Sequence, residues 1–249
     1  MPQDTKTDSA IILALESSGN AASAAIMVDE KIAGFQEHKA RHGHAETLIG
    51  LADAAAVKAG VQLADITHIA AGCGPGSFTG LRVCLSAAKG YQLATGAKPL
   101  GISGLSALAY HAAGHNKIGD NQIYLCVADS RRGTFFAQLF DAELGVLNEI
   151  KDYDIASLKA LIIEVLAEET VNKLVICGLD EEGFKQNTEL ADLREEKIVD
   201  NNVKFHSHYL DARDIAYFAL ASLHAPAQFT LAGLEPLYIA APKLGGARP

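Results

Sequence analysis

The sequence predicts an α/β fold with two lobes, of which the second is reduced. Two observations lead to this class. Each half of the chain begins with short apolar runs broken by turn residues, and then changes to alternating helical and strand patterns. In addition, 49% of the 249 residues are hydrophobic, which is enough to fill the core of a chain of this length.

Three strands are predicted at the start of the first lobe. Residues 10–15 and 21–28 are apolar runs separated by turn residues at 17–20, which is typical of a hairpin. After a further turn, residues 31–38 alternate between apolar and polar around Ile32. The chain is therefore expected to begin with an antiparallel meander.

Helices and strands alternate in the rest of the first lobe. Apolar residues recur at helical spacing over residues 44–59, and Gly60 ends this helix. The pattern then predicts a strand, a helix stopped by Gly96 and another strand, at residues 66–71, 77–95 and 100–103. Three strands, helix, strand, helix and strand make a ribonuclease-H-like half.

The second lobe repeats this order. A helix at residues 105–113 leads to a second meander, which starts at Ile123 and turns at residues 131–133. The remaining predicted elements are a helix at 155–168, a strand at 174–178, a short strand near Ile198, and a helix at 211–224 capped by Asp211. The repetition predicts an actin-like ATPase (ASKHA) fold. We expect the first lobe at residues 1–110, including partner-binding helices, and the second at 111–249, with helix 211–224 able to pack back on the first.

Charge and cysteine content limit the function. Acidic residues outnumber basic ones by 30 to 21, the net charge is −9, and no cluster of Lys and Arg could neutralise phosphates, so any nucleic acid would be held only indirectly, by a partner. The four cysteines form no C-x-x-C pair, which favours reduced thiols in a core. Residues 1–8 lack the pattern of a signal peptide, and no apolar run is long enough for a bilayer. We expect a cytoplasmic protein.

A glycine-rich loop at residues 72–76 precedes the helix at 77–95. Its amides, at the positive end of a helix, could contact an anion. The spacing fits neither the P-loop nor the dinucleotide fingerprint, in which Thr79 would occupy the third glycine position. A tight turn capped by Ser77 is an equally good interpretation. The candidate nucleotide or anion contacts are Glu16, Ser17, Ser18, Gly74 and Gly76.

Several motifs resemble the TsaB (YeaZ) family. Residues 72–82, Gly-Cys-Gly-Pro-Gly-Ser-Phe-Thr-Gly-Leu-Arg, look like its G-P-G-S-F-T-G-L-R loop. Residues 13–18 resemble its first strand and turn, with Glu16 and Ser17 in place of Asp and Thr. Residues 41–48, 129–133 and 235–239 are similar to its R-x-H-x-E, D-A-R-x-G-E and P-x-Y-L motifs. The resemblance extends from about residue 10 to 242 and is thin between 140 and 205.

The resemblance implies a non-catalytic subunit. The related TsaD carries a metal-binding H-x-x-x-H, but this chain has Gly104 and Leu108 at the matching positions, and neither can bind a metal. It further implies a heterodimer with TsaD, in the complex that makes N6-threonylcarbamoyladenosine at position 37 of tRNA. TsaE would take part and TsaC would supply threonylcarbamoyl adenylate. The chain would form a homodimer when alone. No tightly bound cofactor is expected, although ATP or ADP could lie at the shared interface.

The expected interface lies on the first-lobe helices, which are apolar over more than one stripe. Packing on the chain's own sheet is the alternative use of these faces. The residues that we predict at the interface are His44, Leu48, Leu51, Ala55, Ser77, Phe78, Leu81, Arg82, Leu85 and Ala88.

Three alternatives involve other chemistry. His111 and His115 have a spacing that could serve a metal, but a surface pair is favoured and no metal site is predicted; His206 and His208 have no assigned role. A stand-alone ATPase or small-molecule kinase could place a hydrated Mg²⁺ near Glu16. That function would need a catalytic Asp and a second adenosine loop, which the pattern lacks. A peptidase is disfavoured because neither H-E-x-x-H nor G-x-S-x-G occurs.

Overall fold

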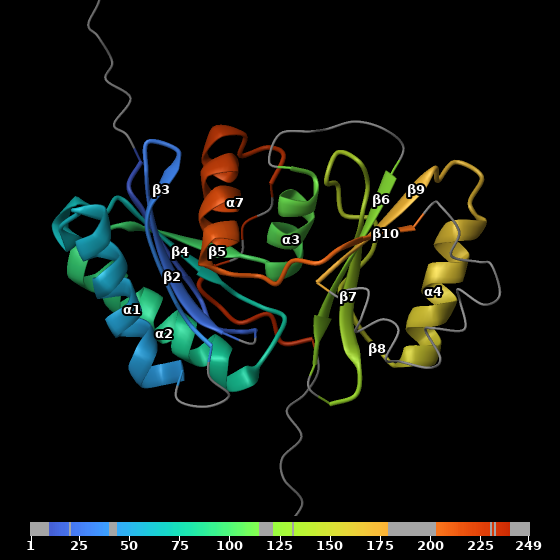
Figure 1. The fold of residues 1–249 in the computed structure, drawn as a ribbon, viewed down its shortest axis with the longest axis horizontal. Coiled ribbons are helices and arrows are strands. Elements are labelled where there is room, and N and C mark those ends of the chain that lie inside the picture. Colours follow the sequence, from blue (N-terminus) through green and yellow to red (C-terminus); the bar gives the residue numbers. More distant parts are fainter. Residues whose placement is uncertain are drawn as a thin grey trace, which may run out of the picture.

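A computed structural model describes most of the chain (Figure 1). The described residues are 10–19, 21–39, 44–114, 122–130, 132–178, 203–229, 231 and 233–239, without the side chains of 44–46. All structural statements below concern these residues. None of the described helices is both long and apolar enough to cross a membrane.

The first sheet has five strands in the order β3-β2-β1-β4-β5. Strands β1 to β3 form the predicted antiparallel meander, and β4 and β5 run parallel to β1. The bounds are β1 Ile12–Glu16, β2 Ala22–Val28, β3 Lys31–His38, β4 His68–Gly72 and β5 Lys98–Ile102. Apolar residues on both faces of β1 explain why helices cover both sides of the sheet.

Helices α1 (His44–Ala59) and α2 (Phe78–Thr95) cover one face of this sheet and enclose a core with it. A short 3-10 helix, Leu63–Asp65, follows α1. The predicted ends of both helices are confirmed. Ser77 caps α2 by accepting a hydrogen bond from the Gly80 amide (3.3 Å), and Gly60 and Gly96 follow the last turns with φ of 67° and 71°. Positive φ favours glycine, so these residues end the helices.

The second sheet repeats the topology of the first, with the order β10-β9-β6-β7-β8. Its bounds are β6 Gln122–Asp129, β7 Phe135–Phe140, β8 Lys151–Tyr153, β9 Lys173–Cys177 and β10 Val203–His206. Its third meander strand is shorter, with 3 residues against 8 in β3. The short strand predicted near Ile198 falls outside the described residues, whereas β10 was not predicted. The duplicated, reduced second lobe is otherwise confirmed.

The last helix of each half packs against the sheet of the other half. Helix α3 (Gly104–Ala112) contacts β6, β7 and β9, while α7 (Ala212–His224) contacts β1, β2, β4 and β5. Helix α4 (Ile155–Ala167) covers the outer face of the second sheet. Figure 1 shows α3 and α7 side by side between the sheets, and they contact each other. The predicted boundary at residue 110 therefore lies inside α3, which contacts the second sheet and α7.

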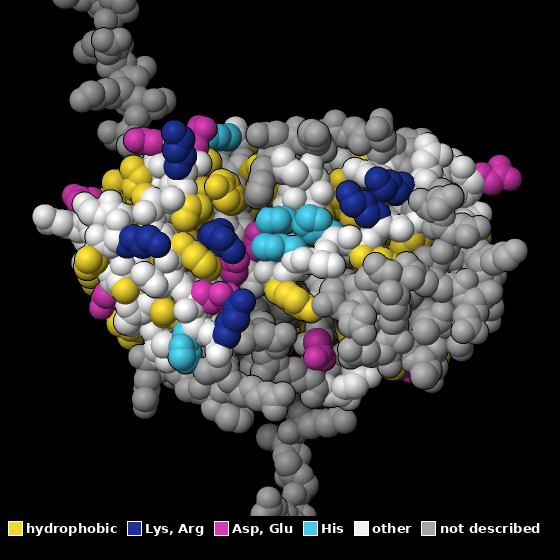
Figure 2. Space-filling view, viewed as in Figure 1, with side chains coloured by type: hydrophobic (Ala, Val, Ile, Leu, Met, Phe, Trp, Pro, Cys, Tyr) yellow, Lys and Arg dark blue, Asp and Glu magenta, His cyan; other side chains and the backbone are white. Residues whose placement is uncertain are grey.

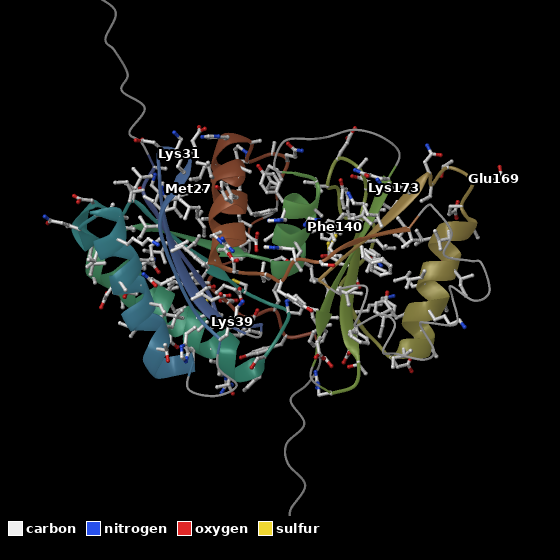
Figure 3. All side chains as sticks on the ribbon, in the orientation of Figure 1. Met27, Lys31, Lys39, Phe140, Glu169 and Lys173 are labelled. Atoms are coloured by element: carbon white, nitrogen blue, oxygen red, sulfur yellow. The ribbon has the colours of Figure 1, made fainter. Side chains whose placement is uncertain are left out.

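The exchanged helices complete two cores. Met27 is fully buried between the first sheet and α7, and Phe140 between the second sheet and α3; Figure 3 labels both. All four cysteines are free and buried, as predicted. The inner surfaces of both sheets thus depend on helices from the opposite half of the sequence.

Candidate partner-binding groove and interlobe cleft

The glycine-rich loop after β4 packs backbone to backbone on the turn after β1. Ser77 N donates to Ser18 O (2.9 Å), and the Ser17 hydroxyl donates to Gly80 O (2.8 Å). A Cβ on Gly80 would overlap the Ser17 carbonyl, and one on Gly76 would press on Ser18. These glycines therefore permit a close backbone approach. The amides of Ser77 and Gly80 are used inside the protein, so they do not face an open anion site.

Glu16 is enclosed rather than directed into a cleft. Its side chain is fully buried, and Oε1 accepts hydrogen bonds from the amide and hydroxyl of Ser18, both at 2.5 Å. Oε2 is buried against Gly72 without a hydrogen-bond partner in the described structure. Burial raises the pKa of Glu16, opposed by the Ser18 hydrogen bonds. A hydrated Mg²⁺ has no room beside this carboxyl group.

A small cleft lies where the two lobes meet. Its walls include Ser18 and Gly76 from the first lobe, Asp129 and Gly178 from the second, and Leu108 from α3. Its volume is about 90 Å³. This is room for about three water molecules, whereas small-molecule sites usually measure about 300–1,000 Å³. Of the five candidate anion contacts, Ser18 and Gly76 line this cleft, and Glu16, Ser17 and Gly74 do not.

A larger and more apolar hollow, the α1–α2 groove, lies on the outside of the first lobe. It has a volume of about 630 Å³. Its walls are Ile49, Asp53, Leu63, Arg82, Val83, Ser86, Ala87, Gly90, Tyr91 and Ala94. The Tyr91 hydroxyl donates to Asp53 Oδ1 (3.0 Å) and so ties the two helices together. Burial and the neighbouring Asp53 raise the pKa of Tyr91, which keeps this donor protonated.

Large apolar side chains are exposed on these same elements. Leu93 is 87% exposed, Val57 81%, Ile49 52% and Leu63 39%. Single exposed apolar residues are common, but several of them around an apolar groove are typical of an interaction surface. The α1–α2 groove and these residues therefore form the candidate binding surface.

Most of the predicted interface residues lie on the opposite sides of the two helices. Leu48, Ala55, Leu81, Leu85 and Ala88 are buried, and the partly buried Leu51 packs against the core. The five buried side chains cannot be reached by a partner in this structure, so the prediction is corrected for them. The three-and-four spacing identifies the stripe that packs on the sheet. The exposed face of α1 is on another side of the helix, at positions 49, 53 and 57.

The other predicted interface residues are divided between the groove and the chain's C-terminal part. Arg82 lines the groove, and its guanidinium lies 3.9 Å from the centre of the Phe78 ring. Phe78 stacks on Tyr238 at 5.1 Å, so residues near the C-terminus partly cover it. Ser77 is the α2 cap. The side chain of His44 lies outside the described part.

Sequence reasoning missed a cluster of histidines near α3 and α7. His111 does not lie alone on the surface, because it and His208 both contact the buried carboxylate of Asp214, at 2.7 and 2.8 Å. His115 lies outside the described residues. The contact between His111 and Asp214 spans 103 positions, so no local spacing could reveal it. The only local sign was the His-x-His at 206 and 208 before a capped helix.

Comparisons with known proteins identify the family. The family model described as TsaD, tRNA N6-adenosine threonylcarbamoyltransferase, matches residues 19–235. An uncharacterized protein of Mycobacterium tuberculosis is 39% identical over 89 residues, 36% of this chain and 38% of its own length. The tRNA threonylcarbamoyladenosine biosynthesis protein TsaB of Escherichia coli is 30% identical over 125 residues, 50% of this chain and 52% of its own. The matched segments thus span about half or less of these relatives.

A solved structure has the same fold. YeaZ from Pseudomonas aeruginosa superposes with a TM-score of 0.68 at 19% identity, over 92% of this chain and 99% of that one. Since the family model covers well over half of the sequence, this chain belongs to the TsaD family, and within that family it is similar to the TsaB (YeaZ) proteins.

Proposed function

We propose that this chain is the non-catalytic partner subunit of a TsaD-containing complex that makes N6-threonylcarbamoyladenosine in tRNA. The family membership and the name of the E. coli relative support a role in this modification. The observation that carries the proposal is the α1–α2 groove, whose apolar walls, together with the exposed Val57 and Leu93 on the same two helices, fit a protein partner. TsaD is the proposed partner, and a second copy of the chain occupies the same surface when TsaD is absent.

The surroundings of Gly104 support the absence of a catalytic metal centre at the position that TsaD uses. By resemblance, Gly104 and Leu108 replace the two histidines of H-x-x-x-H. Even a Cβ on Gly104 would come within 2.7 Å of a Leu210 methyl group. A histidine there would therefore displace Leu210. The transfer reaction is accordingly assigned to the partner, with TsaE participating and any ATP or ADP bound at the shared interface.

The alternative of a stand-alone ATPase or kinase has less support. It needs a nucleotide between the lobes and a metal near Glu16, but the cleft there holds about 90 Å³ and Glu16 is enclosed. Tight ATP binding by the isolated chain, lost on Glu16→Ala, is the result that would favour this alternative.

Reconstitution tests the proposed role. TsaD, TsaE and TsaC homologues are incubated with unmodified tRNA, ATP and the substrates of TsaC, with and without this chain, and the modified nucleoside is quantified by mass spectrometry. We expect modification only when the chain is present. Full activity of the partners alone would refute the subunit role.

Paired variants locate the working surface. Gly90→Arg fills the groove, and a side chain at Gly90 meets nothing within the chain itself, so the fold should be kept. Ala160→Arg, at an exposed position of α4, is the control. We expect Gly90→Arg to abolish the stimulation and Ala160→Arg to retain it. Equal activity of both variants would exclude the groove as the docking site.

A further inference from the structure

Two histidine side chains from separate parts of the chain converge on Asp214. His111 lies in the last turn of α3, His208 between β10 and α7, and Asp214 in the first turn of α7. His111 Nδ1 is 2.7 Å from Asp214 Oδ1, and His208 Nε2 is 2.8 Å from Oδ2. Histidine side chains gather at the middle of the face shown in Figure 2, where the lobes meet.

The carboxylate in this cluster is a buried anion. Asp214 is 2% exposed. Burial alone disfavours its charge, but hydrogen bonds from His111 and His208 outweigh burial and hold the pKa of Asp214 at about 2. A buried carboxylate needs compensating partners, and the two imidazoles provide them here. The cluster therefore concentrates one negative charge and two imidazole rings at a single point.

The imidazoles are arranged unusually closely. The rings of His111 and His208 are stacked, with centres 3.7 Å apart and planes 6° apart. A third ring, that of His206, lies 5.1 Å from His111, and its buried Nε2 has no hydrogen-bond partner in the described structure. Metals bind the neutral imidazole, and the hydrogen bond to Asp214 raises the pKa of His208, so an ion would compete with a proton at this ring.

The cluster is accessible from outside. It forms part of the wall of a hollow of about 530 Å³, together with Ile32, Phe35, Arg213 and Tyr217. His111 and His208 retain 26% and 22% of their side-chain exposure. An ion from solution can therefore reach the nitrogen atoms without unfolding of the chain.

We propose that His111, His208 and Asp214 bind one divalent transition-metal ion, with Zn²⁺ as the best match. Two imidazole nitrogens and one carboxylate oxygen are a donor set that Zn²⁺ and Fe²⁺ accept. The three donor atoms lie within 4.8 Å of one another. Donors about 2.1 Å from a common ion are at most about 4.2 Å apart, so only a small contraction is needed.

Binding also requires the rings to turn. In stacked rings the nitrogen lone pairs run parallel, whereas a shared ion must lie close to the plane of both rings. One or both imidazoles must therefore rotate out of the stack, and the hollow beside them offers the space. The site differs from the H-x-x-x-H position of TsaD, since His111 lies about two turns along α3 from Gly104.

The ion would join the two halves of the fold. His111 is carried by α3, which packs on the second sheet, and Asp214 by α7, which packs on the first. A metal bond between these helices would act as a cross-link within the molecule. Its fourth position would face the hollow and take water or another ligand.

Metal titration of the full-length, untagged and chelator-treated chain tests this proposal. Zn²⁺ is titrated by calorimetry, and Co²⁺ is added separately as a spectroscopic probe whose visible absorption reports low-symmetry binding by nitrogen and oxygen. We expect one ion per chain, a visible Co²⁺ spectrum without thiolate bands, and a higher melting temperature with Zn²⁺. The proposal is overturned if saturating Zn²⁺ gives no heat of binding and saturating Co²⁺ gives no visible absorption.

Variants locate the site. His208→Gln and His111→Gln should each weaken Zn²⁺ binding at least tenfold and remove the thermal shift, with far-UV circular dichroism as the check of folding. The double variant His42→Gln/His44→Gln is the control. It removes two histidines that lie close to each other in another part of the sequence, and it should leave Zn²⁺ binding intact. If the affinity depends on that pair instead, or survives the double change of His111 and His208, the cluster is only a hydrogen-bonded contact between helices.

Discussion

Replacing Val57 and Leu93 by serine should weaken association through the α1–α2 groove. The two side chains are 81% and 87% exposed on the outer faces of α1 and α2. Burial of a complete Val or Leu side chain is worth about 1.5–3 kcal/mol, so covering the exposed fractions of both contributes about 2.5–5 kcal/mol. At 1.4 kcal/mol per tenfold, loss of this contribution raises Kd by roughly 60-fold to 4,000-fold.

The isolated chain should tolerate the double substitution. Neither side chain contributes much to the core, and serine costs a helix only a few tenths of a kcal/mol at each position. The melting temperature should therefore change little. Calorimetric titration of a TsaD homologue measures the affinity, and sedimentation velocity of the chain alone measures self-association through the same surface.

A control distinguishes the groove from a general effect. Ile163, 36% exposed on α4, receives the same replacement by serine and should leave Kd unchanged. A Kd for the Val57→Ser/Leu93→Ser variant within threefold of that of the unsubstituted chain would refute the assignment of this surface. So would an equal loss of affinity in the Ile163→Ser variant.

Three further predictions concern stability and reactivity. Gly80→Ala should lower the free energy of unfolding by about 1–3 kcal/mol in urea titrations, because the added Cβ meets the Ser17 carbonyl. Gly50→Ala, whose Cβ would meet nothing, should be neutral or stabilising. If the two substitutions changed the free energy of unfolding equally, the close packing at Gly80 would be contradicted. Glu16→Gln should stabilise the protein more at pH 8 than at pH 5. A carboxyl group whose pKa is higher in the folded than in the unfolded protein destabilises the fold as the pH rises above the unfolded pKa. If the difference in stability between the variant and the unsubstituted chain does not change with pH, Glu16 is not a buried carboxyl group with one oxygen left without a hydrogen bond. Burial raises the pKa of Cys73 to about 11, and the other three cysteines are also buried. All four thiols should therefore react with a disulfide reagent only as the protein unfolds. Rapid reaction of the native protein would disprove this prediction.

The sequence predicted features that depend on local chemistry. Gly60 and Gly96 end helices because positive φ favours glycine, and Asp211 caps α7 by accepting a hydrogen bond from the Arg213 amide (2.7 Å). The meanders are likewise visible as alternating runs and turns. Each of these features is determined within a few neighbouring residues, so it can be read without knowledge of the tertiary fold.

Features that depend on distant contacts were not predictable in the same way. The exchange of α3 and α7 between sheets leaves no local pattern, because an apolar helix face does not specify which sheet it covers. The apolar stripe of α1 similarly does not distinguish Leu48 in the core from Ile49 in the groove until the sheet is placed. The contacts of Asp214 with two histidines arise only when α3 and α7 meet.

The crossing of α3 and α7 has a consequence for how this chain can come apart. Drawing the two lobes away from each other would uncover Met27 and Phe140 together, since each relies on a helix supplied by the opposite half. Heat or denaturant should therefore melt both sheets in one transition. A fragment that stopped after α3 would display an orphan helix and an unprotected sheet, and aggregation would be its expected fate.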